Sequence, residues 1–277
     1  MMSAKWQLWK NQLFTVVGLE LKRNLLTKRS IGLYLLAFMP VVIIALHAAD
    51  PGRGRVGHLE EDTVILAGIF QFFYLRLGIF FGCLGIFTWL IRGEMIHKSL
   101  HYYFLAPMRR EILVLGKFIA GTLIAGATFA TAVLLCFTLM YGHLGMAGQE
   151  FVFNGPGAHH LYAYLGITFL ACIGYGALFL AFSLMVKNPI IPGAMVLGWE
   201  TISGVFPTML QKLSVTYYLK LLLPVEVPAR GFLAIFTVVT EPISAWIAVP
   251  GMLLLVAGVL TFACYRVRWM EIDYGTE

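Results

Sequence analysis

Six apolar stretches, separated by short polar segments, account for most of this chain of 277 residues. They lie near residues 31–49, 64–91, 112–141, 161–186, 190–210 and 243–265. A helix needs roughly 20 residues to cross the hydrocarbon core of a bilayer, and each stretch reaches about that length. The pattern therefore predicts an all-α polytopic membrane protein with six transmembrane helices, which form a single transmembrane domain over residues 1–277.

The composition agrees with this fold class and excludes several functions. The chain is 60% hydrophobic and 12% charged, whereas soluble domains carry about 25% charged residues. The spans use up most of the length and leave no room for a separate soluble enzyme domain. The net charge of +6 is explained by the basic bias of cytoplasmic segments, so it does not indicate a nucleic-acid partner.

The distribution of Lys and Arg predicts the orientation in the membrane. The N-terminal segment carries six, the stretch from Arg92 to Lys117 five, the turn between the fourth and fifth spans one, and the C-terminal tail two. The segments on the other side carry five in all. We therefore expect a multi-pass protein of the cell (cytoplasmic) membrane with both termini in the cytoplasm.

Two segments outside the spans have a character of their own. Residues 5–29 are too polar to span and predict an amphipathic helix in the inner interface, unless they are only a basic tail that sets the topology. Its apolar stripe is formed by Trp6, Trp9, Leu13, Val16 and Val17, and Glu20 and Asn24 interrupt it. Residues 211–242 are broken by prolines yet apolar, which predicts an outer re-entrant or interfacial element before the sixth span.

Two charged residues fall near the middle of predicted spans, Arg76 in the second and Glu200 in the fifth. A charge at the centre of a spanning helix costs about 2.5–3.5 kcal/mol on insertion scales. Arg76 and Glu200 either form a pair or line a substrate route, and a purely structural ion pair is an equal alternative. Ser203 shares the face of Glu200 and belongs to the same candidate pathway.

Small residues mark one face of the second span. Gly78, Gly82 and Gly85 share this face with Gln71, and we expect another helix to approach closely there. At ~100° per residue, Arg76 points about 160° away from this face. Both faces of the second span should therefore meet protein or water.

The polar loop over 92–111 is basic, and three interpretations are open for it: docking of a soluble partner, contact with anionic lipid, or metal binding. The metal interpretation depends on His97 and His101, whose i, i+4 spacing would place both imidazoles on one helix face. The remaining histidines are expected on the outer side, so this pair alone is an incomplete metal site. The chain also lacks a phosphate-binding G-x-x-x-x-G-K-[ST] loop and cannot hydrolyse ATP by that route.

The same loop resembles a pattern of the permease subunits of type-2 ATP-binding-cassette (ABC) exporters, the ABC-2 type transporter family. That pattern reads E-x-x-x-G-T-x-x-x-L-x-x-x-P-x-x-R-x-E-I-L-x-G-K. Glu94 corresponds to the leading acid and Pro107 to the proline, and Arg110-Glu111-Ile112-Leu113 followed by Gly116-Lys117 corresponds to its end. Lys98-Ser99 replaces the usual Gly-Thr. The resemblance is specific over residues 92–120, and six spans, cytoplasmic termini and an N-terminal elbow helix agree with it.

The resemblance implies that the loop forms a coupling helix, which docks on a separate ABC ATPase (nucleotide-binding) subunit. The implied coupling residues are Glu94, Lys98, His101, Tyr102, Tyr103, Phe104, Pro107, Arg109, Arg110 and Glu111. ATP and Mg would be bound by the partner ATPase, and this chain would bind no cofactor or metal and would not be an enzyme. A second permease subunit, in a homodimer or a related heterodimer, and membrane lipid are further implied partners.

The implied function is coupling of ATP hydrolysis in the partner to outward transport of an amphipathic or lipid-like substrate. Two alternatives stay open. One is an integral membrane enzyme with a histidine-bound metal, built on His97, His101 and the pair Arg76 and Glu200. The other is a membrane anchor or regulator of an ATPase that transports nothing.

Overall fold

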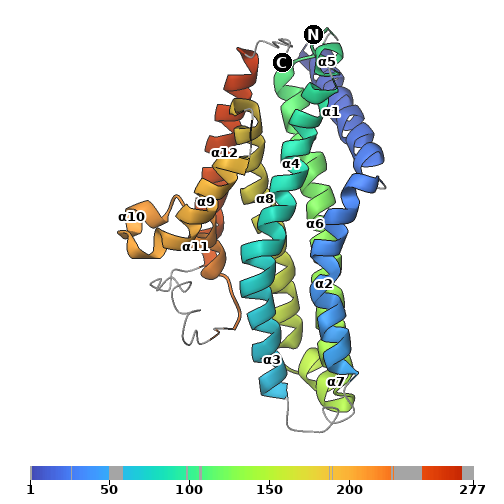
Figure 1. Ribbon diagram of the computed structural model, residues 1–277, viewed down its shortest axis with the longest axis vertical. Coiled ribbons are helices and arrows are strands. Elements are labelled where there is room, and N and C mark those ends of the chain that lie inside the picture. Colours follow the sequence, from blue (N-terminus) through green and yellow to red (C-terminus); the bar gives the residue numbers. More distant parts are fainter. Residues whose placement is uncertain are drawn as a thin grey trace.

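The structure is a computed structural model and describes residues 2–25, 27–49, 59–97, 99–105, 108–186, 188, 190–225, 227 and 245–269. Within these ranges all regular structure is helical, and the long helices form an elongated bundle (Figure 1). Five helices are long and apolar enough to cross a membrane. The chain is therefore a multi-pass, all-α membrane protein, as the apolar stretches predict.

Four of the six expected spans appear as long helices close to the expected bounds. They are α2 (Ile31–Ala48), α6 (Arg110–Gly142), α8 (Gly157–Met185) and α12 (Ala245–Arg268). Helices α6 and α8 lie at the centre, because α6 packs against α1, α2, α4, α8 and α12. Helices α2 and α12 are mostly exposed along their apolar windows, as expected for helices at the edge of a bundle in lipid.

The second expected span is longer than its apolar core and is not a uniform α-helix. It runs from Leu59 to Ile96 as α3 (Leu59–Gly68), a π-helical segment η2 (Ile69–Gly78) and α4 (Ile79–Ile96). A π-helix has more residues per turn than an α-helix, so the rotation of 100° per residue that relates Arg76 to the glycines does not hold here. Nothing in the residue pattern of a single sequence marks this change of winding.

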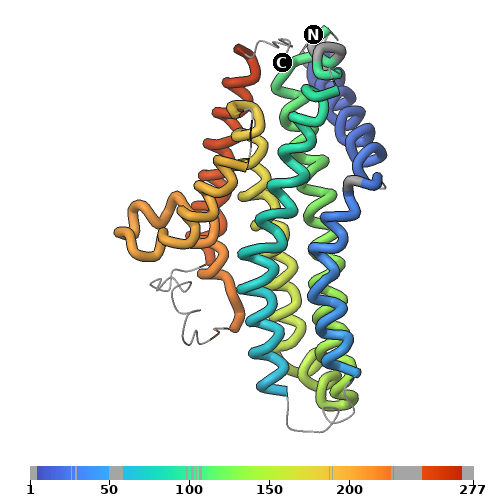
Figure 2. Tube along the Cα trace, in the orientation of Figure 1, coloured from blue at the N-terminus to red at the C-terminus, as the bar shows by residue number. Residues whose placement is uncertain are grey.

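The fifth expected span differs most from the expectation. The stretch 190–210 forms α9 (Ile190–Ile202) and a 3₁₀ turn η3 (Ser203–Val205), and this apolar helix is shorter than the five candidate spans. Phe206 is extended (φ −86°, ψ 159°), as expected for the residue before Pro207. The short helices α10 (Thr208–Gln211) and α11 (Val215–Lys220) then project from the side of the bundle and return to it (Figure 2). Helix α11 packs against α8 and α12, and residues 228–242 of the expected outer element 211–242 lie outside the described residues.

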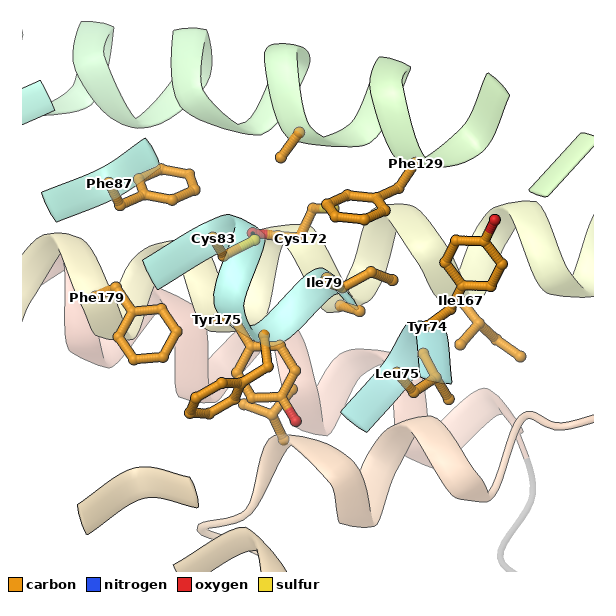
Figure 3. Close-up of a cluster of buried hydrophobic side chains, with 14 of the residues drawn as sticks. Tyr74, Leu75, Ile79, Cys83, Phe87, Phe129, Ile167, Cys172, Tyr175 and Phe179 are labelled. Carbon is orange, nitrogen blue, oxygen red and sulfur yellow. Dashed lines mark hydrogen bonds between the residues drawn. The ribbon is translucent and has the colours of Figure 1, made fainter. Parts of the chain in front are cut away.

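The core lies where α4, α6 and α8 meet (Figure 3). Aromatic rings fill it: Phe80 contacts Phe179 edge-on at 5.0 Å between ring centroids, and the Phe129 ring lies against Gly82 of α4. A Cβ on Gly82 would stand 2.7 Å from the Phe129 ring and 3.0 Å from Leu33. The expected close approach on the glycine face is therefore observed at Gly82, where α4 meets α6 and α2.

Both ends of the described chain lie at one end of the bundle, together with α5 (Leu100–Leu105), whereas α7 (Met146–Phe153) lies at the other (Figure 1). Helix α1 (Met2–Asn24) runs steeply down beside α6 and leads into α2 through the 3₁₀ turn η1 (Lys28–Ser30). Gly116 permits this packing, because a Cβ there would lie 2.6 Å from a methyl group of Val16.

Candidate functional site

Four charged side chains converge beneath α5, at the end of the bundle that holds both termini. Glu20 and Arg23 come from α1, Glu94 from the last turns of α4, and Lys117 from α6. The Lys117 ammonium lies 2.9 Å from Oε1 of Glu94 and forms a second ion pair with Glu20. Arg23 donates to the same Glu94 oxygen at 3.1 Å. We call these four residues the charge cluster.

The charge cluster is almost completely buried. The side chain of Lys117 is fully buried and both carboxylates are 3% exposed, whereas Arg23 is 43% exposed. Two carboxylates balance two cations, and the amide of Asn24 donates to Oε2 of Glu20 at 2.9 Å. Buried charges persist only when they are paired in this way. The charge cluster therefore fixes α1, α4 and α6 to one another at this end.

Tyr103 connects α5 to the charge cluster. The Lys117 ammonium lies 5.4 Å from the centroid of the Tyr103 ring, within the range of a cation–π contact. Burial raises the pKa of Tyr103, and the negative charges of Glu94 and Glu20 raise it further. The phenol therefore stays neutral. Among the described side chains of α5, Tyr103 contacts the charge cluster in this way and Leu100 is buried in the apolar core, so α5 is joined to the bundle at both residues.

The residues after α5 join the bundle at two further points. The Arg109 guanidinium lies over the ring of Trp9 in α1, 4.3 Å from its centroid. Arg110 donates to the backbone carbonyl of Arg268 in α12 at 3.2 Å, and Glu111 forms an ion pair with the Arg268 side chain. The start of α6 thus contacts both the first and the last helix of the chain.

Two large apolar side chains beside the charge cluster face outward. Ile96 ends α4 and is 68% exposed, and Leu105 ends α5 and is 79% exposed. A single exposed apolar residue is ordinary on a protein surface. These two flank a short helix at the end of the bundle where the chain is basic, so they offer apolar contacts to a partner. Neither was singled out by the sequence pattern.

The structure separates the two histidines of the predicted metal pair. Helix α4 ends at Ile96 with His97 as its C-cap, and α5 begins at Leu100, so His97 and His101 do not share one helix face. The ring of His97 packs edge-on against Trp89 at 5.9 Å. Among the described residues, no group of three or more His, Cys, Asp or Glu side chains is arranged to hold a metal.

Part of the predicted coupling set lies beyond what the structure describes. Lys98 and Pro107 fall outside the described residues, and only the backbones of His101, Tyr102 and Phe104 are described, within α5. The described partners of Glu94 are Lys117 and Arg23.

The Glu200 carboxylate has a defined structural role in the α9–α11 segment. It accepts hydrogen bonds from the Ser214 hydroxyl at 2.5 Å and from the backbone N–H groups of Val215 and Thr216 at 2.9 and 3.0 Å. These N–H groups begin α11 and have no acceptor within the helix. The carboxylate is therefore a cap that fixes α11 to α9, and a negative charge suits this end of a helix.

Arg76 and Lys220 both lie within electrostatic range of the Glu200 carboxylate. The structure thus brings the two predicted intramembrane charges into one neighbourhood, although three of the hydrogen bonds to Glu200 come from the start of α11 and the residue before it. Ser203 is buried and donates to the Glu200 backbone carbonyl at 3.2 Å. Gln71 donates to the backbone carbonyl of Val225 at 2.8 Å, which links the second span to the segment after α11.

A second buried polar group lies at the opposite end of the bundle. Asp62 in α3 is fully buried, with Oδ1 3.1 Å from Nε2 of His47 in α2 and Oδ2 3.3 Å from Nε2 of His143 at the end of α6. The two imidazole rings meet edge-on at 6.1 Å. This contact holds α2, α3 and α6 together far from the charge cluster.

The residues that sequence reasoning missed, Glu20 and Lys117, did leave a signal. Glu20 interrupts the apolar stripe of the N-terminal helix, and Lys117 lies within the predicted third span. Opposite charges placed against two apolar patterns indicate buried partners, but a separation of 97 residues gives no indication that they meet. Comparison of the sequence with models of known protein families and with curated proteins finds no match.

Proposed function

We propose that this chain is the membrane-spanning permease subunit of an ABC exporter of the type-2 class. A separate ATPase subunit would bind and hydrolyse ATP with Mg, and α5 would be the coupling helix that docks on it. A second permease subunit would complete the transport path. In this role the chain catalyses nothing itself and converts the ATP cycle of its partner into outward movement of an amphipathic substrate.

The charge cluster is the observation that carries the proposal. A coupling helix must pass a force from a soluble partner to the spanning helices, so its base has to be fixed firmly to several of them. Glu94 and Tyr103 fix the two sides of the α4–α5 turn to Lys117 and, through it, to α1 and α6. Movement of α5 would then move α1, α4 and α6 together, whereas a solvated loop would yield without moving them.

The docking contacts would come from the outward side of the same end. Ile96 and Leu105 would provide apolar contacts with the ATPase, and exposed Arg109 would face acidic groups on it. Glu94 would act from inside the protein, as a fixed point beneath the loop. The metal-enzyme alternative loses its main support, because His97 and His101 are on separate helical segments.

Co-purification with an ATP turnover readout tests the proposal. The affinity-tagged chain, extracted from its native membrane, should retain an ATPase whose activity elutes with it. Leu105→Glu should lower the co-eluting activity at least tenfold, because it places a charge within an apolar contact. Met146→Glu is the matched control, since Met146 is 87% exposed on α7 at the opposite end, and it should retain the activity. Equal ATP turnover in both variants, or none with the unaltered chain, would contradict the proposal.

A transport measurement separates the permease from a membrane anchor that transports nothing. The co-purified complex in vesicles should move a fluorescent phospholipid across the bilayer when ATP is supplied. An anchor would sustain ATP turnover without any movement of this probe. A substrate outside the lipid-like class would give the same result, so a panel that includes water-soluble amphipathic dyes belongs to the same experiment.

A further inference from the structure

A pocket of about 310 Å³ lies between the α1–α2 bend and α4, outside the charge cluster. One wall is formed by η1 and the first turns of α2, and the other by the face of α4 that carries Gly82 and Gly85. Pockets that bind small ligands begin at about 300 Å³ and are mostly apolar with a few polar groups. This pocket therefore has the size and character of a binding site.

The polarity of the pocket changes from one end to the other. Asn24, Thr27 and Ser30 form a polar end beside η1, and the hydroxyls of Thr27 and Ser30 lie 3.2 Å apart. The body is lined by apolar residues that include Leu33 and Phe81. One end can thus receive ester and hydroxyl groups, while the body can receive only hydrocarbon.

The polar end of the pocket adjoins a positively charged residue. Lys28 is exposed in η1 and stands between Thr27 and Ser30 in the sequence. The nearby acids Glu20 and Glu94 are already paired with Lys117 and Arg23 and do not offset it. A lysine in this position favours a ligand whose polar end carries a negative charge.

The pocket also borders surface that faces lipid in a spanning protein. Phe81 is 43% exposed although it lines the pocket, and Ile31 and Leu35, which precede the pocket-lining Gly32 and Leu36 on α2, are 52% and 69% exposed. A hydrocarbon chain could enter from the side without crossing a polar barrier. A water molecule takes about 30 Å³ and a methylene group is of similar size, so the pocket has room for a large part of one acyl chain.

We propose that this pocket binds one anionic phospholipid of the membrane, with an acyl chain between α2 and α4 and its phosphate near Lys28. The lipid would fill the space at the α1–α2 bend and fix the angle between these helices. This site depends only on the chain crossing a membrane, so it stands whether or not the chain couples to an ATPase.

Two glycines permit a sharp test, because each points into the open pocket. A Cβ on Gly85 or on Gly32 would meet no atom within 4 Å, so a leucine at either position can begin in open space and extend into the pocket. Gly198 in α9 has the same open surroundings but lies outside the pocket, and Gly198→Leu is the matched control. Thermal unfolding of the detergent-purified full chain would show that each variant is folded.

The probe is phosphatidylglycerol with a photoactivatable diazirine in one acyl chain, mixed with the purified chain and irradiated. Peptides of α2 and α4 should be labelled, and Gly85→Leu and Gly32→Leu should each reduce this labelling at least fivefold relative to Gly198→Leu. Equal labelling in all three variants would overturn the proposal, because the label would then report only the lipid around the protein. Failure of both filled variants to fold would overturn it too, since the pocket would not be open.

The headgroup is tested with a phosphatidylcholine version of the same probe. The unaltered chain should prefer phosphatidylglycerol, and Lys28→Gln should reduce this preference about fivefold, the effect of one cation near an anionic surface. Lys212→Gln, at an exposed lysine far from the pocket, should leave it unchanged. A preference that is absent, or insensitive to Lys28, would contradict the anionic headgroup. A change of oligomeric state in Gly85→Leu with unchanged lipid labelling would instead place a second copy of the chain over the pocket.

Discussion

Replacement of Lys117 by methionine should destabilise the protein more than any surface change. Lys117 is fully buried and pairs with two carboxylates that are each 3% exposed. After Lys117→Met, Arg23 would be the only cation left in the charge cluster. It pairs with Glu94, and its own side chain is 43% exposed. Removal of one partner from a buried ion pair costs about 3–5 kcal/mol, because the opposite charge is left buried without compensation.

Thermal unfolding in detergent measures this effect. At about 2–4 °C per kcal/mol for a chain of this size, the midpoint should fall by about 6–20 °C. The triple variant Lys117→Met, Glu20→Gln and Glu94→Gln should recover most of the loss, because it removes the unpaired charges as well. Lys22→Met, at an exposed lysine of α1, should change the free energy of unfolding by less than about 0.5 kcal/mol. A Lys117→Met midpoint equal to that of Lys22→Met would refute the buried charge cluster.

Three further predictions concern other parts of the fold. Glu200→Gln should lower the free energy of unfolding by about 1–3 kcal/mol, because donors at the start of α11 lose a charged acceptor. Glu150→Gln, at an exposed position, is the control. An equal melting temperature for the two variants would contradict the role of Glu200 as the cap of α11. Gly116→Ala should lower the free energy of unfolding by about 1–3 kcal/mol, because the new Cβ would overlap Val16 of α1. Gly18→Ala is the control, since a Cβ there meets open space and should not destabilise the protein. Calorimetry of the two variants compares their stabilities directly. A cysteine in place of Met146 should react with a membrane-impermeant maleimide added outside intact cells, and a cysteine in place of Leu105 should not. The reverse result would invert the expected topology. The native cysteines Cys83, Cys136 and Cys172 are buried, so they should contribute little background labelling.

The long helices could be predicted from the sequence, because an apolar run of roughly 20 residues in a membrane protein forms a spanning helix. The stretches 31–49 and 161–186 match α2 and α8 to within a few residues at each end. The stretch 190–210 does not form one continuous helix, because Pro207 disfavours helical geometry at Phe206 and the helix ends before Phe206. The mean hydropathy of the stretch does not reveal this break. The π-helical winding of 69–78 had no sequence signal at all.

The sequence drew attention to the region of the charge cluster but did not reveal its contacts. The basic loop that resembles a coupling element lies at the end of the bundle where the charge cluster is found. Its residue pattern gave Glu94 no partner outside the loop, because one sequence indicates contacts only between neighbours along a helix. The described partners of Glu94 lie on α1 and α6, and tertiary packing alone decides such contacts. The same limit hid the contact of Glu200 with α11.

Photo-crosslinking at position 105 tests the coupling proposal most directly. A photoactivatable amino acid in place of Leu105, introduced into the chain in its native membrane, should form a covalent adduct with one soluble protein. That protein should also be labelled by an azido derivative of ATP, and the same amino acid in place of Met146 should form no such adduct. Absence of an ATP-binding adduct at position 105, or the same adduct at both positions, would contradict the assignment of α5 as the helix that couples this chain to an ATPase.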